Sequence, residues 1–281
     1  MRRLVFITCL LPALLALAFS CAPVAATAQD SEKQRAQQLW EQAIAAKGGR
    51  GRLYAVRNIV ISSAGSYKAL QFKIHPDGET KSRSLKRSGL FREELYVFPN
   101  KYWLWDDYRP SVFGLWVEMY DYTTRMKYVV TDGDPNHGLE PIEANDLNTD
   151  KGLIITQLMY LLESEWVRPK PLAVTTVRIG FRVFDVVQTE VNGARYDFTL
   201  DRKTHLPVRF TFYSQDLGRT FVHTNEMSDY SDVDGINVPL TWKAEDGHKE
   251  KSEVKFNVEY DEKIFLKPPP FEAGPEAWKK K

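Results

Sequence analysis

The connections between successive strand candidates constrain this chain more than any other feature. Runs rich in β-branched and aromatic residues are joined through short turn-forming stretches such as HPDGET (75–80), FPNKY (98–102) and EVNGARY (190–196). Parallel neighbours need a crossover of about a dozen residues or more, so links this short force antiparallel pairing. The sequence therefore predicts an antiparallel meander.

Strand candidates in the second half of the chain alternate between apolar and polar residues, which predicts one dry and one wet face. Two stretches carry the pattern: Tyr196, Phe198 and Leu200 alternate with Arg195, Asp197 and Thr199, and Val254, Phe256, Val258 and Tyr260 alternate with Lys255, Asn257 and Glu259. A twisted sheet of roughly ten strands or more curls, which makes its apolar side concave. We predict a mainly β fold, a large curved antiparallel sheet or half-open barrel of roughly 11 strands, with two to three helices covering its concave face.

An acidic turn followed by a proline occurs twice. Asp201–Thr204 precedes Pro207, and Asp232–Gly235 precedes Pro239. Proline has no N–H, so it fits the first residue of a strand or an edge, where no ladder bond is lost. We therefore expect both prolines at the start of hairpin strands.

Two segments have helical periodicity. The first, 31–49, carries an apolar stripe, a possible capping box at Ser31 and Gln34, and a stop at Gly48-Gly49. The second, 150–166, is more apolar and ends before Pro169. Both helices need an apolar surface to lie on, and the concave face of the sheet supplies one.

The first 28 residues are typical of a cleaved export signal, with Arg2 and Arg3, an apolar run from Leu4 to Phe19 and small residues up to Ala28. We predict that the mature chain is a single domain, 29–281, in the periplasm, with an extended proline-rich tail at 266–281. Two alternatives stay open. The leader is retained as an anchor, or Cys21 is lipidated and the chain is an outer-membrane lipoprotein.

Both cysteines, Cys9 and Cys21, lie in the leader. The mature chain therefore has no disulfide, no thiol chemistry and no cysteine-ligated metal. The whole chain has 38 basic and 37 acidic residues, and the leader removes two arginines and no acids, which leaves a net charge of −1. This balance argues against a nucleic-acid partner. We expect a monomer.

Enzymatic signatures are absent from the sequence, which contains no G-x-S-x-G, H-E-x-x-H, C-x-x-C, P-loop or dinucleotide-binding pattern. Its histidines are scattered without paired spacing, at His75, His137, His205, His223 and His248. We expect no enzyme and no cofactor. One loop, 132–143, places Asp132, Asp134, Asn136, Glu140 and Glu143 in a degraded calcium-loop register, in which His137 takes the place of the required glycine. An acidic solvated loop is the favoured interpretation, so we predict no metal.

A curled sheet this wide has more apolar inner wall than two helices about 10 Å across can cover. We therefore predict an apolar cavity for a ligand. The residues expected to line the cavity or its rim are large and apolar: Trp103, Trp105, Trp116, Met119, Leu158, Met159, Leu162, Phe198 and Phe256. Tyr120 belongs to the same aromatic stretch. Each of these aromatics is also compatible with an ordinary core position.

Several stretches together resemble the exported LolA/LolB-type lipoprotein-carrier superfamily, in its broad group of sorting-protein-like members. They are AQQLWEQAIAAKGG, YDFTLDRKTHLPVRF, YSDVDGINVPLTW and VKFNVEYDEKIFLKPPP. The resemblance spans nearly the whole mature chain and implies a half-open barrel with helices as a lid over a cavity for acyl chains. It also implies an arginine on an early strand, for which Arg83, Arg87 and Arg92 are candidates by region.

The sequence thus favours a non-enzymatic periplasmic carrier of lipid or lipoprotein acyl chains. The alternative is an envelope scaffold or assembly protein that binds a protein partner through its sheet edge or aromatic rim, with a packed interior and no ligand cavity.

Overall fold

The computed structural model describes most of the chain beyond the leader. Its described residues are 22–74, 80–109, 114–131, 138–142, 149–216, 219–245, 247–267 and 273–280. Among them no helix combines the length and apolar character needed to span a bilayer. Cys9, Cys21, the arginines of the leader and most of the acidic loop, including Asp132, Asp134, Asn136 and Glu143, lie outside the described residues.

The described residues form one antiparallel sheet of 13 strands in the order β6-β5-β4-β3-β2-β1-β13-β12-β11-β10-β9-β8-β7. The first wing comprises β1 (Asn58–Ile74), β2 (Thr80–Val97), β3 (Lys101–Asp107), β4 (Leu115–Asp121), β5 (Met126–Thr131) and β6 (Glu140–Pro141). The second comprises β7 (Lys170–Ile179), β8 (Arg182–Val191), β9 (Ala194–Leu200), β10 (Pro207–Asp216), β11 (Arg219–Val233), β12 (Ile236–Ala244) and β13 (Lys249–Phe256). The predicted mainly β, antiparallel, open sheet is confirmed.

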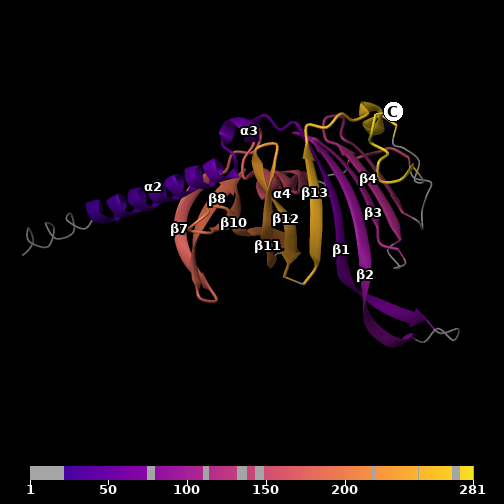
Figure 1. The fold of residues 1–281 in the computed structure, drawn as a ribbon, viewed down its shortest axis with the longest axis horizontal. Helices are drawn as coiled ribbons and strands as arrows, with labels where there is room; N and C mark the ends of the chain where they lie inside the picture. The colour runs from indigo at the N-terminus through magenta and orange to yellow at the C-terminus, as the bar shows by residue number, and fades with distance from the viewer. Residues whose placement is uncertain are drawn as a thin grey trace, which may run out of the picture.

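The sheet consists of two meanders that meet in the middle. The chain builds β1 to β6 outward, crosses through α4 (Thr149–Leu161) to the far edge at β7, and returns strand by strand until β13 pairs with β1. Ile59 lies opposite Phe256 at this closing pair, and Ser63 opposite Ser252. The two ends of the domain are thereby joined, and α4 is carried into the hollow between the wings (Figure 1).

The first helix, α2 (Ala22–Lys47), begins well before Ser31, so the predicted capping box is wrong: Ser31 lies inside the helix. Its predicted end is confirmed. Gly48 has φ 127°, and a Cβ at this position would lie 2.2 Å from the carbonyl oxygen of Gly235, so only glycine fits. The short helix α3 (Arg50–Tyr54) follows directly. Helix α2 runs along β7 and β8 in Figure 1.

The inner core lies between the helices and the concave face of the sheet. Trp40 of α2 meets Phe198 of β9 edge to face, with ring centroids 5.1 Å apart. Leu158 and Leu161 of α4, and Leu162 directly after it, are fully buried in the same cluster. Burial of a large apolar side chain stabilises by about 1.5–3 kcal/mol relative to exposure, so this cluster fixes both helices on the sheet.

The two turn prolines have different positions. Pro207 is the first residue of β10, as predicted. Pro239 lies inside β12, opposite Tyr230 of β11, so it does not begin the strand; it takes the other position expected of a strand proline, at an edge. Pairing of β12 with β13 begins only at Thr241, opposite Lys251. Pro239 therefore lies where β12 has one partner strand, and its missing N–H costs no ladder bond.

A second core lies on the outer face of β1 to β4, opposite the helices. Trp103, Trp105 and Met119 are buried there, and the C-terminal segment covers them with Ile264, Phe265 and Trp278. Trp278 Nε1 donates a hydrogen bond of 2.8 Å to Glu93. The predicted extended tail is therefore wrong for the described part of 266–281: Trp278, only 4% exposed, packs on the sheet after the 3-10 helix η2 (Glu262–Phe265).

The predicted alternation at the end of the chain stops at Phe256. Val254 and Phe256 belong to the inner core, as expected, but β13 ends there and Asn257 has φ 50°. Val258 and Tyr260 then pack against the outer core. The left-handed residue turns the chain from one face of the sheet to the other, which no period-2 pattern anticipates.

Candidate functional site: a groove beside helix α4

Helix α4 divides the hollow of the sheet into two sides with different chemistry. On one side, Met159 contacts Asn225 of β11, at 3.9 Å between Sδ and Nδ2. On the other side, Thr156 interacts with the Tyr96 hydroxyl, and Ser252 with the Tyr160 hydroxyl. The helix is thus held by polar contacts to β2 and β13, while its opposite flank faces β9 to β11.

An open pocket of about 680 Å³ lies on the β9–β10 side of α4. Its apolar wall is formed by Ile155 of α4 and by Tyr196 and Phe212 of the sheet. The rest of its lining is Lys151, Gly152, Gly193, Ala194, Arg195, Tyr213, Ser214 and Gln215. A Cβ at Gly152 would contact nothing within 4 Å, so this glycine leaves the wall of the pocket open.

The opposite side of the hollow is polar and charged. Arg92 of β2 donates two hydrogen bonds to Asp106 of β3, from Nε to Oδ1 at 2.6 Å and from Nη2 to Oδ2 at 2.8 Å. Arg92 also lies 3.8 Å from Glu250 of β13, which contacts His248 at 2.6 Å. Burial by itself lowers the pKa of Arg92. The carboxylates of Asp106, Glu94 and Glu250 have the opposite effect and hold the pKa of Arg92 well above its ordinary value.

Tyrosines form a ladder across this polar wall. The Tyr96 hydroxyl donates to Glu94 at 2.8 Å, and the Tyr102 hydroxyl donates to the same carboxylate oxygen at 3.3 Å. Burial raises the pKa of Glu94 to about 7, against the opposing effect of Arg92. Burial also raises the pKa of Glu118 on β4, two strands further along. This wall therefore holds acids that ionise less readily than in water.

These inward charges correct one expectation from the sequence. Most charges were expected to point outward, yet Arg92, Glu94, Asp106 and Glu118 share the concave face. The reason is the outer core: β2 to β4 turn Leu95, Trp103 and Met119 outward, against the C-terminal segment. Since successive side chains alternate between faces, the polar set is left on the inside.

The nine predicted ligand-binding residues do not gather in one place. Leu158, Met159, Leu162, Phe198 and Phe256 are buried in the inner core. Trp103, Trp105 and Met119 lie in the outer core, which the C-terminal segment covers. Trp116 shares the inner face with Asp106, its partner across β3 and β4, and Tyr120 with Tyr102. The open pocket borders the inner core at Ile155, next to Met159 and Leu158 in the helix.

Sequence reasoning missed the pocket residues Ile155, Tyr196 and Phe212, although Tyr196 was predicted to face the dry side. The polar wall had a visible signal on β2, where Arg92, Glu94 and Tyr96 alternate with the residues that face outward. Arg92 lies in this wall, whereas nothing is described for the side chains of Arg83 and Arg87.

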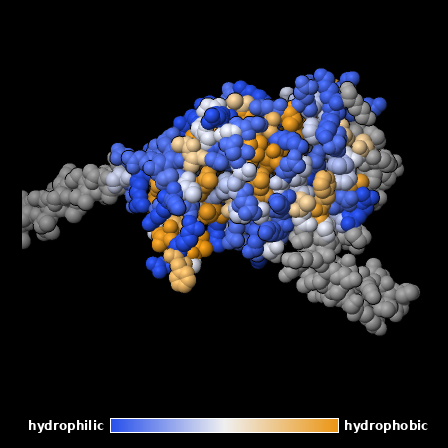
Figure 2. All heavy atoms as spheres, viewed as in Figure 1, coloured by the Kyte–Doolittle hydropathy of each residue, from blue (hydrophilic) through white to orange (hydrophobic). Residues whose placement is uncertain are grey.

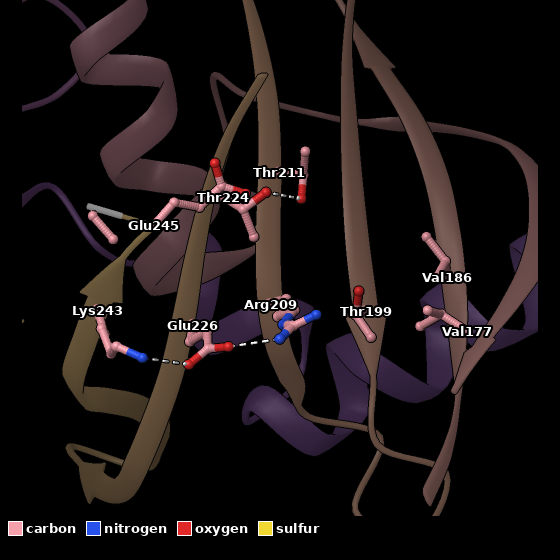
Figure 3. A pocket seen from close by; sticks show the side chains of 10 residues that line it. Val177, Val186, Thr199, Arg209, Thr211, Thr224, Glu226, Lys243 and Glu245 are labelled. Carbon is pink, nitrogen blue, oxygen red and sulfur yellow. Dashed lines mark hydrogen bonds and ion pairs between the residues drawn. The ribbon is translucent and has the colours of Figure 1, made fainter. Parts of the chain in front are cut away.

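A smaller pocket, about 360 Å³, lies on the outer face of the second wing. Figure 3 shows its lining on β7 to β12: Arg209 is hydrogen-bonded to Glu226 at 2.6 Å, and Lys243 lies 3.5 Å from the same carboxylate. Its charges neutralise one another, and its threonines pair across strands at 3.1 Å. This pocket is shallow, polar and unlike a lipid site. Among the described residues no group of three or more His, Cys, Asp or Glu is placed to hold a metal.

No family model and no curated protein matches this chain. Its structure is similar to a lipoprotein-sorting domain described as putative, from Vibrio parahaemolyticus, at 11% identity and a TM-score of 0.41, over 84% of this chain and 97% of that one. A LolA superfamily protein from Nitrosomonas europaea is similar at 12% identity and a TM-score of 0.40, over 82% and 96%. The Pseudomonas aeruginosa MucA/MucB complex matches at 9% identity and a TM-score of 0.18, over 80% and 94%.

Proposed function

We propose that this chain is an exported, non-enzymatic carrier that binds the acyl chain of a lipid or lipoprotein in the pocket between α4 and β9–β10. The observation that carries the proposal is the pocket itself, about 680 Å³ and open to solvent, with Ile155, Tyr196 and Phe212 in its wall. Small-molecule sites have volumes of about 300–1,000 Å³ and walls that are mostly apolar and aromatic.

The chemistry of the hollow supports an acyl chain on this side of α4. The polar wall of Arg92, Glu94 and Asp106 lies on the other side, where an alkyl chain would leave charged groups without water or partners. The pocket wall presents aromatic rings and an isoleucine instead. The side of α4 that faces Arg92 therefore favours polar groups, and the side that carries Ile155 favours an alkyl chain.

The free energy gained by burying an alkyl chain is large enough for measurable binding to the pocket. Burial of about fifteen methylene groups at about 0.8 kcal/mol each gives a gross gain on the order of 12 kcal/mol. Association costs of about 4–15 kcal/mol oppose this gain. Binding in the micromolar range is expected for a chain that is only partly enclosed, which suits a carrier that must also release its cargo.

The second candidate function is a scaffold that binds an envelope protein through the free edge of β7. The sheet ends at this strand, and Leu172 on it is exposed. Unpaired strand edges accept extended segments of other chains. Native mass spectrometry of the purified chain separates the two functions: co-purifying acyl species support the carrier, and a ligand-free chain that also fails to bind added fatty acid supports the scaffold.

A further inference from the structure

The tip of the β7–β8 hairpin presents an aromatic side chain to solvent. Ile179 and Arg182 pair across the hairpin, and Gly180 and Phe181 connect them. Phe181 has a relative exposure of 103%, the largest value among the exposed large hydrophobic residues of the described chain. Its ring therefore contributes almost nothing to the packing of the fold.

The turn does not require a phenylalanine. Gly180 has φ 60°, whereas Phe181 does not adopt a left-handed conformation. A two-residue turn of this kind needs glycine at its first central position and accepts polar residues at the second. Since neither the turn nor the core explains Phe181, an external contact is the remaining role for its side chain.

Apolar side chains lie next to the tip, and basic side chains lie around them. Val183 is 37% exposed on the same hairpin, and Figure 2 shows hydrophobic surface gathered over β7 and β8. Around it, four basic side chains are exposed: Arg178, Arg182, Arg202 and Lys203.

The acids near the tip are buried beneath the basic side chains. Arg202 donates to Asp185 at 2.9 and 2.8 Å, and Arg182 pairs with Asp201. Both carboxylates are less than a tenth exposed. The outward charge of this end of the sheet is therefore positive, around a single protruding aromatic ring.

We propose that the β7–β8 tip docks on the surface of an anionic phospholipid bilayer, with Phe181 inserted at the boundary between head groups and acyl chains. Aromatic rings are favoured at this depth, and basic side chains near the surface add attraction to anionic lipids. One ring is far too small for a stable protein interface, which needs about 800 Å² from each partner. The tip lies outside the cargo pocket, so this inference does not depend on the proposed function.

Vesicle co-sedimentation tests the proposal with the chain that begins at Gln29. Wild type is expected to bind vesicles of phosphatidylcholine with phosphatidylglycerol better than vesicles of phosphatidylcholine alone. Phe181→Ser is expected to lower binding about tenfold, since a lost ring at the interface has an effect of that order. The control is Leu266→Ser, because Leu266 is 69% exposed at the end of η2, away from the tip.

Two further variants separate insertion from surface charge. The chain that begins at Gln29 contains no cysteine, so Phe181→Cys carries an environment-sensitive NBD label at one position, and its fluorescence is expected to rise on anionic vesicles. The double variant Arg178→Gln/Lys203→Gln is expected to bind anionic vesicles more weakly, and its binding should depend less on the salt concentration. Equal vesicle binding by wild type and Phe181→Ser, an unchanged NBD signal, or an equal loss in Leu266→Ser would overturn the proposal.

Discussion

Arg92 and Asp106 form a bidentate ion pair on the concave face of the sheet, with donor–acceptor distances of 2.6 and 2.8 Å. Asp106 is almost fully buried, and Tyr108 donates to its second oxygen at 3.1 Å. The pair links β2 to β3 inside the hollow, at the centre of a polar wall that faces α4. Its presence explains why hydrocarbon is expected only on the other flank of that helix.

Replacement of Asp106 by asparagine should destabilise the fold, because it removes the carboxylate that binds the Arg92 guanidinium through two hydrogen bonds and leaves only the more distant Glu250, at 3.8 Å. Removal of one partner from a buried pair costs about 3–5 kcal/mol. Urea unfolding of Asp106→Asn measures the loss. Asp107→Asn is the matched control: Asp107 pairs with the exposed Arg109, so its loss should cost under about 1 kcal/mol. Equal effects of the two variants would contradict the role given to Arg92.

Glu94 should make stability fall as the pH rises from about 4.5 to 7. Its pKa is raised to about 7 by burial, from 4.5 in the unfolded chain, so the folded state holds a proton that the unfolded state releases in this range. Glu94→Gln should therefore be more stable than wild type at pH 8, by up to about 3 kcal/mol, and lose that advantage near pH 5. Unfolding titrations at both pH values test this. An advantage that does not change with pH would contradict it.

Lys47 is fully buried at the end of α2, and its ammonium group has no hydrogen-bond partner among the described residues. Burial lowers its pKa from 10.5 to about 7. The unfolded chain thus binds an extra proton between about pH 7 and 10.5, so the stability of wild type should rise with pH in this window.

Lys47→Met should remove this cost and raise the free energy of unfolding by several kcal/mol at pH 7, on the order of the 1.4 kcal/mol expected per pKa unit times the shift. The gain should shrink toward pH 10. Lys33→Met, at an exposed position of the same helix, is the control and should change little. A Lys47→Met variant that is less stable than wild type at pH 7 would show that the contact of the amine with the Tyr230 ring, 5.4 Å from its centroid, outweighs the cost of burial.

The C-terminal segment should be part of the folding unit. Trp278→Ala should lower the free energy of unfolding by about 3–5 kcal/mol, because it empties the site over the outer core. Trp278→Phe keeps most of the ring but loses the donor to Glu93, which still accepts from Ser62 at 2.7 Å, so a smaller loss of about 1 kcal/mol is expected. Thermal unfolding of the two variants gives the order, and an unaffected Trp278→Ala would show that the segment is a loose tail.

Sequence patterns predicted the sheet well because its connections are short and its strands alternate. Tyr196, Phe198 and Leu200 all lie in the buried interior, as expected. The patterns failed where both faces of a strand are buried, because its apolar residues then belong to two different cores. On β3 and β4, the large apolar residues Trp103 and Met119 were assigned to the cavity, whereas they lie under the C-terminal segment. Periodicity tells which side chains share a face but not which face is covered, and by what.

Periodicity also could not predict where α4 lies on the sheet. Leu158 and Leu162 were predicted to line the cavity but lie in the inner core, and the pocket lies beside Gly152 and Ile155, at the start of the helix. That position is set by contacts from Tyr96 and Ser252, which come from strands distant in sequence. Such tertiary contacts leave no local pattern.

The most direct test of the carrier function is a titration of the chain with a fluorescent fatty acid. Gly152→Phe adds a large side chain to the wall of the pocket, at a position where a Cβ meets nothing within 4 Å. Gly51→Phe is the control, because a Cβ at this position of α3 also meets nothing within 4 Å but Gly51 does not line the pocket. Wild type and Gly51→Phe are expected to bind with similar affinity, and Gly152→Phe at least about tenfold more weakly. Unchanged binding by Gly152→Phe, or no binding by wild type, would contradict a cargo site beside α4.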